Sequence, residues 1–248
     1  MNAIIRPEQS ATWQLTRSSF LSLWRMPAYS LPTILFPVGF YVFFGLVLNP
    51  GLAQWMLSTF GTFGVMGTAL FAFGVSVSIE RSQGWWLLLR AAPTPFAAVL
   101  AGKLATVVVF SLMILLSMAW LAAIFAGVRL ETGQWLALVG VLILGAVPFS
   151  LLGLALGLWL SPNAAPAVIN VIYLPLAILS GLWVPISQLP GLLQSLALWL
   201  PPYHLAGLAL HVSGTQAGPS VQHVAALLAF TLFSVVLAAL AWRRFKGA

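Results

Sequence analysis

The sequence predicts an all-α integral membrane protein with six transmembrane helices, an N-terminal helix at the membrane interface, and an outer re-entrant hairpin between spans five and six. Composition is the first reason. Hydrophobic residues occupy 61% of the 248 positions and charged residues 5%, whereas a soluble domain carries about 25% charged residues. Length is the second, because a bilayer core of about 30 Å needs about 20 apolar residues per helix. Six spans therefore leave no room for a second soluble domain.

Six apolar runs are long enough to cross a bilayer as helices. A spanning segment must satisfy its backbone hydrogen bonds internally, and no run alternates with period two as a barrel strand would. An all-helical fold follows. The expected spans are residues 30–48, 57–79, 99–126, 135–160, 166–186 and 222–242.

The basic residues predict the orientation, because cytoplasmic connections of membrane proteins are enriched in Lys and Arg. With a cytoplasmic N-terminus, the outer side receives only Arg129, accompanied by Glu131, of the 10 basic residues. The formal net charge of +7 is therefore a topology signal and not a sign of nucleic-acid binding. Both termini are expected in the cytoplasm. The inner basic residues are Arg6, Arg17, Arg25, Arg81, Arg90, Lys103, Arg243, Arg244 and Lys246.

The N-terminal segment lacks the apolar stretch of a signal peptide. Residues 10–26 place three aromatic side chains near one helical face, with two arginines interrupting the surface, as in a helix that lies at the membrane interface. We expect residues 1–27 to be a cytoplasmic N-terminus with this amphipathic helix, and residues 28–248 to be the transmembrane domain. The aromatic residues are Trp13, Phe20 and Trp24, and the arginines are Arg17 and Arg25.

The connection 187–221 is apolar but is interrupted by prolines and a glycine. Its apolar piece, residues 192–200, is too short to cross a bilayer. A re-entrant or interfacial hairpin on the outer side is expected. The interrupting residues are Pro190, Gly191, Pro201 and Pro202.

Several motifs are absent from the sequence. It contains no phosphate-binding Gly-x-x-x-x-Gly-Lys-Ser/Thr loop, so an ATPase would have to be a partner chain. Metalloprotease and serine hydrolase motifs are missing too, and there is no cysteine. No charged residue lies at the centre of an expected span, which argues against an ion-coupled carrier.

Several polar and small residues have two interpretations. His204, His211 and His223 in or beside the outer connection suggest either a metal site or interfacial anchoring, and we expect no metal. Asn170 and Tyr173 at mid-depth of the fifth span either line a path or bond a neighbouring helix. Glycines in two spans predict close helix packing. They are Gly61, Gly64, Gly67 and Gly74 in the second span, and Gly145, Gly153 and Gly157 in the fourth.

Two segments resemble a known family. Residues 79–93, with Glu80, Arg81, Gly84, Leu88 and Pro93, are similar to the segment after the second span in permeases of ATP-binding-cassette (ABC) exporters of the type 2 class. The sequence LSGLWVPISQLP at residues 179–190, followed by LPPY at 200–203, resembles the end of the fifth span and the outer hairpin of that family. Small drug or antibiotic efflux permeases are the most similar in kind. One departure is His211, near the place where many relatives have an arginine.

The resemblance implies a dimer of permeases, homomeric or heteromeric, each docked on a cytosolic ABC ATPase that holds ATP and magnesium. This chain itself would carry no cofactor. The segment after the second span would couple the two subunits, and the second and fifth spans would border the central path. The implied coupling residues are Glu80, Arg81, Gly84, Leu88, Arg90 and Pro93. The candidate path residues are Thr62, Phe63, Met66, Asn170 and Tyr173.

The expected function is therefore that of a transport subunit, not an enzyme. It would export an apolar or amphipathic solute, drug-like or lipid-linked, across the bacterial cytoplasmic membrane. Two alternatives stay open: a polytopic membrane enzyme acting on lipid head groups with the three histidines as its site, and an ion-coupled secondary carrier. The sequence does not specify the solute.

Overall fold

The computed structural model describes residues 7–91, 95–216 and 220–247, and this part of the chain is helical with no β-strand. The expected all-α fold is confirmed. A π-helix, Tyr41–Leu48, continues α2, and short 3-10 turns lie at Pro50–Leu52 and Ile186–Gln188. The α-helices are α1 Pro7–Trp24, α2 Pro27–Phe40, α3 Ala53–Ser82, α4 Trp85–Ala91, α5 Phe96–Phe125, α6 Thr132–Trp159, α7 Ala165–Leu179, α8 Gly191–Ala197, α9 Pro201–Val212 and α10 Ser220–Gly247.

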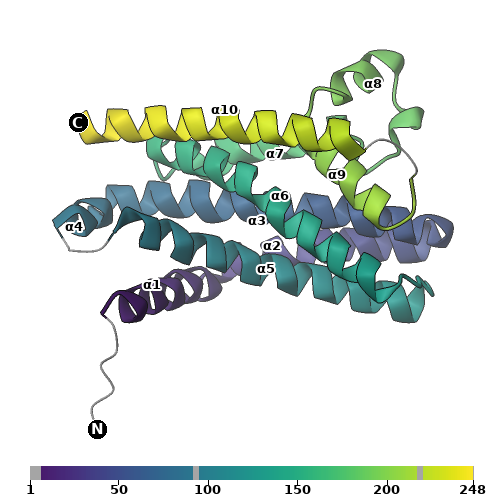
Figure 1. Ribbon diagram of the computed structural model, residues 1–248, viewed down its shortest axis with the longest axis horizontal. Helices are drawn as coiled ribbons and strands as arrows, with labels where there is room; N and C mark the ends of the chain where they lie inside the picture. Colours follow the sequence, from purple (N-terminus) through teal and green to yellow (C-terminus); the bar gives the residue numbers. More distant parts are fainter. Residues whose placement is uncertain (1–6, 92–94, 217–219, 248) are drawn as a thin grey trace, which may run out of the picture.

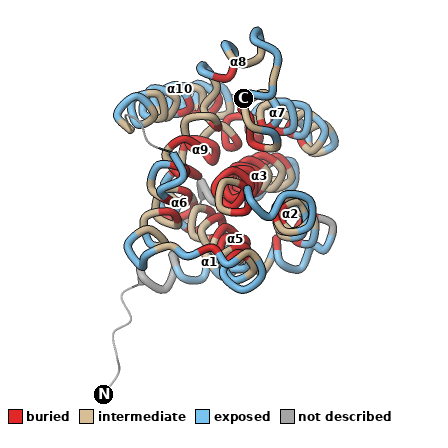
Figure 2. The backbone as a smooth tube through the Cα atoms, turned by 90° about the vertical axis from the view of Figure 1, so that its right-hand side faces the viewer, coloured by how far each residue is buried: buried red, intermediate tan, exposed pale blue. Residues whose placement is uncertain are grey.

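The long helices form an elongated bundle around α3. Figure 1 shows α4, the beginning of α1 and the end of α10 at one end of the bundle, with α8 and α9 at the other. Viewed along the long axis in Figure 2, α3 is the buried central helix, and the surrounding helices turn exposed faces outward. A 30-residue helix that buries apolar side chains on all sides is what a bundle centre requires.

Five helical segments in the described residues are long and apolar enough to cross a membrane: Tyr29–Leu48, Pro50–Ser82, Phe96–Phe125, Thr132–Trp159 and Ser220–Phe245. These correspond to five of the six expected spans. The remaining helix, α7, has only 15 residues, fewer than the roughly 20 that a straight crossing needs. The count of six spans therefore stays a prediction.

The expected end of the fifth span, residue 186, is wrong by several residues because α7 stops at Leu179. Gly181 has a φ of +73°, a conformation that glycine adopts without steric cost. The N–H of Leu182 bonds to the Ala177 carbonyl at 3.1 Å, and the N–H of Gly181 bonds to the Ile178 carbonyl. This is a glycine-terminated C-cap, which ends a helix regardless of the apolar residues that follow.

Helices α3 and α6 touch through their backbones. A Cβ atom added at Gly157 would lie 2.7 Å from the Gly74 carbonyl oxygen, and one at Gly153 would lie 3.0 Å from that of Leu70. Only glycine allows so short an approach, so the close packing expected from the glycines of the second and fourth spans is confirmed.

Helix α1 runs alongside the first half of α5 (Figure 1). The backbone N of Thr16 lies 3.1 Å from where a Cβ of Gly102 would be. Eight residues further along both helices, the ring of Trp24 lies 6.2 Å from that of Phe110. The equal spacing means that the two helices advance in the same direction. The interfacial position of this helix and the boundary between residues 27 and 28 stay predictions.

The expected outer connection contains α8 and α9. Helix α8 has seven residues and cannot cross a bilayer, as the sequence suggested. Helix α9 packs back into the bundle, where the Leu205 side chain occupies the space beside Gly145 of α6. The Gln54 amide of α3 donates to the Ser213 carbonyl at 2.7 Å. Whether this hairpin is re-entrant stays a prediction.

Candidate functional site

A cavity of about 680 Å³ lies between α2, α3 and α7, and extends to the loop that follows α7. None of the residues that line it is charged. Aromatic rings from all three helices and the loop form much of its wall. They belong to Tyr29, Phe36 and Phe40 of α2, Phe63 and Phe71 of α3, Tyr173 of α7, and Trp183 of the loop. Such a wall suits an apolar or aromatic molecule and disfavours an ion.

The α2 wall arises from helical spacing. Tyr29, Thr33, Phe36 and Phe40 follow one another at intervals of four, three and four residues, which places them on one face. Leu35, the neighbour of Phe36 in the sequence, does not line the cavity.

Tyr173 and Phe63 are held together. The Tyr173 hydroxyl donates a hydrogen bond to the Phe63 carbonyl at 3.0 Å, and the two rings stack with centroids 4.7 Å apart. Gly67 makes this possible, because a Cβ there would lie 2.6 Å from the tyrosine oxygen. Tyr173 thus both bonds a neighbouring helix and lines the cavity, so the two interpretations of this residue are compatible.

Two further polar groups reach the cavity wall. Asn170 is exposed, and its amide nitrogen donates to the Pro166 carbonyl at 3.1 Å. The indole N–H of Trp183 is buried and has no hydrogen-bond partner among the described residues. An unpaired buried donor is costly, and because protein encloses this nitrogen, the Trp183 ring lines the cavity without presenting its N–H to it.

The remaining two candidate path residues lie elsewhere. Thr62 and Met66 are fully buried, and neither lines the cavity. The Thr62 hydroxyl donates to the Ser58 carbonyl of its own helix at 2.9 Å. Phe63, Asn170 and Tyr173 are therefore brought together, while Thr62 and Met66 pack within the bundle. A path role for any of the five stays a prediction.

The segment after α3 turns sharply at Gly84, whose φ of +74° favours glycine. It then forms the seven-residue helix α4. Trp86 is buried, whereas Leu87 and Leu88 are 60% and 63% exposed. The side chain of Arg90 and the whole of Pro93 lie outside the described residues. The coupling role of the segment stays a prediction.

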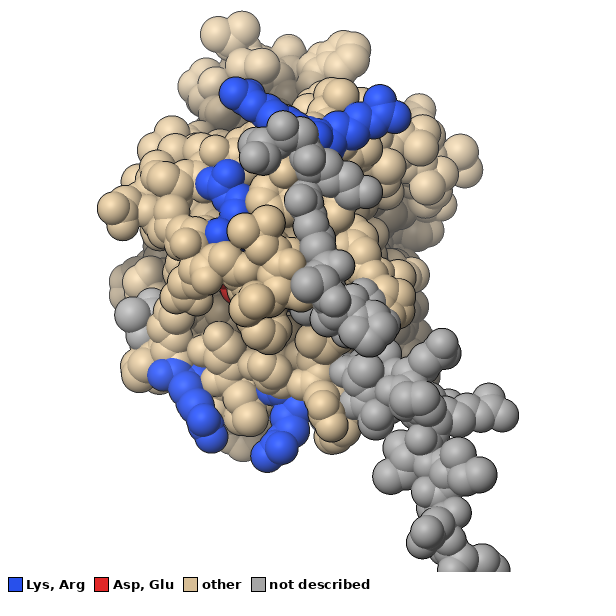
Figure 3. Space-filling model, turned by 90° about the vertical axis from the view of Figure 1, so that its left-hand side faces the viewer, with Lys and Arg blue, Asp and Glu red and all other residues tan. Residues whose placement is uncertain are grey.

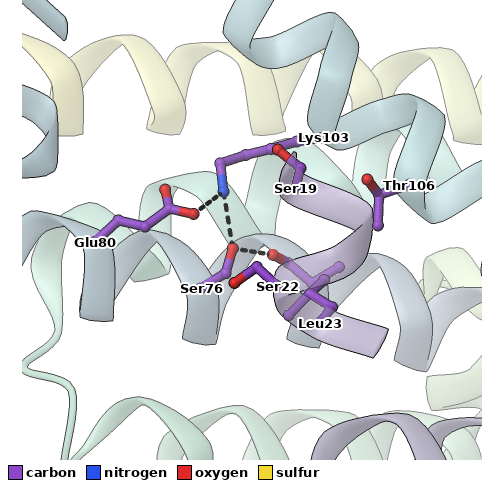
Figure 4. Close-up of a pocket in the computed structure, with 8 residues that line it drawn as sticks. Ser19, Ser22, Leu23, Ser76, Glu80, Lys103 and Thr106 are labelled. Carbon is purple, nitrogen blue, oxygen red and sulfur yellow. Dashed lines mark hydrogen bonds and ion pairs between the residues drawn. The ribbon is translucent and has the colours of Figure 1, made fainter. Parts of the chain in front are cut away.

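Glu80 is the anchor of this segment (Figure 4). Its Oε1 lies 2.6 Å from Nζ of Lys103 on α5, and its Oε2 accepts a hydrogen bond from the Trp86 indole at 3.2 Å. Lys103 also donates to the Ser76 hydroxyl at 3.0 Å. One carboxylate therefore joins the end of α3 to both α4 and α5.

Arg81, the residue after Glu80, bonds to α6 and not to α4 or α5. Its Nη2 donates to the Leu160 carbonyl at 2.8 Å, which ties the end of α3 to the end of α6. The cation bound by Glu80 is Lys103, a residue that the sequence marked only as a topology signal. The sequence could have indicated this ion pair, because Lys103 is a lone lysine in an apolar helix and such a group needs a partner.

His204 and His223 form a pair. Nδ1 of His204 lies 3.0 Å from Nδ1 of His223, and Nε2 of His204 donates to the Leu198 carbonyl at 2.9 Å. Since a carbonyl only accepts, a neutral His204 carries its proton on Nε2 and accepts the Nδ1 proton of His223. Burial lowers the pKa of His204, and the bond to Leu198 opposes this effect. Among the described residues, no cluster of three possible ligands forms a metal site.

Charge is distributed unequally between the two ends of the bundle. Figure 3 views the end that carries α4, where Lys and Arg side chains are spread over the surface with very little acidic area. The connection between α5 and α6, at the other end, contains Arg129 and Glu131. The described basic residues on elements that reach the α4 end are Arg17, Arg25, Arg81, Lys103, Arg243 and Arg244.

Comparison with known proteins agrees with these features. The family model described as "ABC-2 type transporter" matches residues 10–213, most of the chain. A relative from Bacillus subtilis (strain 168), named "Putative transport permease YvfS", is 27% identical over 243 residues, which cover 96% of each chain. The matched region contains the cavity, α4 and the hairpin helices. This chain therefore belongs to the ABC-2 type transporter family and is a multi-pass membrane permease.

Proposed function

We propose that this permease is the membrane subunit of an ATP-driven exporter that moves an uncharged apolar or amphipathic solute out across the cytoplasmic membrane. The cavity between α2, α3 and α7 is the observation that carries this proposal. Its 680 Å³ would hold a drug-sized molecule. Its wall has aromatic rings and no charge, and polar side chains such as that of Asn170 would orient a solute by hydrogen bonds.

The energy source would be a separate ATPase, with ATP and magnesium bound on that subunit, because this chain has no phosphate-binding loop. Helix α4 is the proposed docking element. It presents Leu87 and Leu88 outward, and Glu80 and Trp86 tie it to the central helix. A push on α4 would therefore reach α3 directly. A second permease, identical or not, would complete the central path.

The proposed orientation places the α4 end in the cytoplasm. The greater number of basic residues at that end supports it, because positively charged connections are retained on the inner side. In this orientation α4 faces the compartment that contains ATP, and the hairpin of α8 and α9 faces outward.

The proposal is tested by transport in inside-out vesicles that contain the chain and the ATPase that co-purifies with it. The probe is N-phenyl-1-naphthylamine, which is uncharged and aromatic. We expect ATP-dependent accumulation of the probe, reduced by Phe63→Ala and unaffected by Leu192→Ala on the exposed helix α8. Accumulation that needs an ion gradient and no ATPase would instead identify a secondary carrier.

A further inference from the structure

The packing of α1 fixes which of its faces is free. Gly102 of α5 approaches the α1 backbone at Thr16, and Phe20 packs on Phe110 with ring centroids 5.7 Å apart. Leu23 is buried on the same side. The opposite face of α1 therefore turns away from α5.

That opposite face is cationic. It consists of six residues of α1 and of Arg25, which directly follows the helix, and none of the seven is acidic. Arg17 and Arg25 are both exposed, and Gln14, Ser18 and Ser22 add neutral hydrogen-bonding groups around them. The arrangement provides two guanidinium groups, two hydroxyl groups and an amide on one surface.

Among the described residues, neither Arg17 nor Arg25 has an acidic partner. The ion pair recorded in the described part of the chain joins Lys103 to Glu80, and neither Arg17 nor Arg25 takes part in it. Guanidinium groups bind carboxylates and phosphates through paired N–H donors. The free charge on this face therefore complements an anion supplied from outside the chain.

The position of the cationic face along the bundle axis indicates which kind of anion would bind there. Ser19 and Ser22 of α1 line the small hollow at Lys103 and Glu80, where the inner ends of α3 and α5 meet (Figure 4). Trp13 lies on the cationic face and is 68% exposed. Tryptophan prefers the head-group layer of a bilayer, and basic residues beside it attract anionic lipids.

We propose that the cationic face of α1, formed by Trp13, Gln14, Arg17, Ser18, Ser22 and Arg25, binds the phosphate group of an anionic phospholipid in the cytoplasmic leaflet. The assignment of the leaflet rests on the orientation given under the proposed function. The phosphate would lie between the two guanidinium groups and accept hydrogen bonds from the serines, while Trp13 would contact the interfacial region of the lipid.

The test uses the purified full-length chain in detergent, delipidated and then titrated with dioleoyl phosphatidylglycerol or dioleoyl phosphatidylcholine. Bound lipid is counted by native mass spectrometry. We expect the wild type to prefer phosphatidylglycerol. Each arginine near an anionic lipid surface contributes about a fivefold factor, and two such factors multiply, so Arg17→Gln/Arg25→Gln should bind phosphatidylglycerol about 25-fold more weakly.

Matched variants distinguish this site from general charge effects. Arg243→Gln/Arg244→Gln removes the same charge from α10 and should keep the preference. Arg17→Lys/Arg25→Lys keeps the charge and should retain part of it. An unchanged preference in the Arg17→Gln/Arg25→Gln variant would overturn the proposal. So would an equal loss in both Gln variants. If the α1 variant loses only its ATPase partner, the face binds a protein and not a lipid. Lipid binding needs no ATP, so failure of transport leaves this result independent.

Discussion

Nζ of Lys103 lies 2.6 Å from Oε1 of Glu80, and only 5% of the lysine side chain is exposed. The partners come from different long helices, and the second carboxylate oxygen holds the Trp86 indole at 3.2 Å. The pair is thus a junction of α3, α4 and α5. Because a buried charge without a partner is strongly unfavourable, each member depends on the other.

Removal of one partner should cost more than removal of both. Lys103→Met leaves Glu80 without its cation, and because the Glu80 side chain is 23% exposed, the loss should be smaller than the about 3–5 kcal/mol of a fully buried pair. Lys103→Met combined with Glu80→Gln should recover much of this stability. Thermal unfolding of the purified permease in detergent measures both. If the effects of Lys103→Met alone and of Glu80→Gln alone simply add in the double variant, the two residues do not act as a pair.

Gly67 should tolerate no side chain. The Cβ of Gly67→Ala would lie 2.6 Å from the Tyr173 oxygen, and overpacking of this kind costs about 1–3 kcal/mol. We expect lower thermal stability and weaker transport of N-phenyl-1-naphthylamine. Gly39→Ala on α2 is the control, since no atom lies within 4 Å of its Cβ position. Equal behaviour of the two variants would contradict the close contact seen at Tyr173.

A charge on the exposed face of α4 should uncouple the permease from its ATPase. Leu88 is 63% exposed, so Leu88→Asp should leave folding intact. In a desolvated interface, however, an aspartate lowers affinity, by about 2 kcal/mol or more at a central contact. Co-purification of the ATPase is the measurement. Leu192→Asp, on a side chain 75% exposed at the other end, is the control and should co-purify normally.

The histidine pair should make stability depend on pH. The pKa of His204 is lowered in the folded protein, so the unfolded chain binds its proton more tightly. Stability is then greatest above about pH 6.5, the usual histidine value, and decreases as the pH falls below it. We expect His204→Gln to reduce this acid-dependent loss of the unfolding temperature. A wild-type slope in the His204→Gln variant would exclude the pair as the cause.

The orientation can be tested by labelling, because the natural chain has no cysteine. Ser187→Cys lies in the expected outer connection and Ser161→Cys in the expected inner one. An impermeant thiol reagent added to intact cells should label the first and not the second. Labelling in the reverse order would invert the topology and remove α4 from the cytoplasm.

The long helices could be predicted because lipid imposes a length and a composition on them. Residues 99–126 were expected as a span and α5 covers Phe96–Phe125. The end of α7 could not be predicted in this way, because hydropathy does not detect the positive φ of Gly181 that ends the helix. Leu182 and the apolar residues after it read as a continuation of the helix, although they lie in a turn.

The site was predicted in part. Phe63, Asn170 and Tyr173 share the cavity, and the family resemblance had assigned them together. Thr62 is adjacent to Phe63 in the sequence but points about 100° away around the helix, into the bundle. Which side of a span faces a cavity depends on its neighbours, and a span that is apolar all round gives no periodic signal.

The backbone contact between α3 and α6 determines which parts of the permease are free to move. At Gly153 and Gly157 the main chains of the two helices lie in direct contact, so we expect the two helices to move as one body. The pair α3 and α6 would be the rigid part of the permease. Helix α2 contains Pro32 and Pro37 and widens into a π-helix, features that weaken a helix against bending. We therefore expect the cavity to open and close by hinging of α2 against this rigid pair.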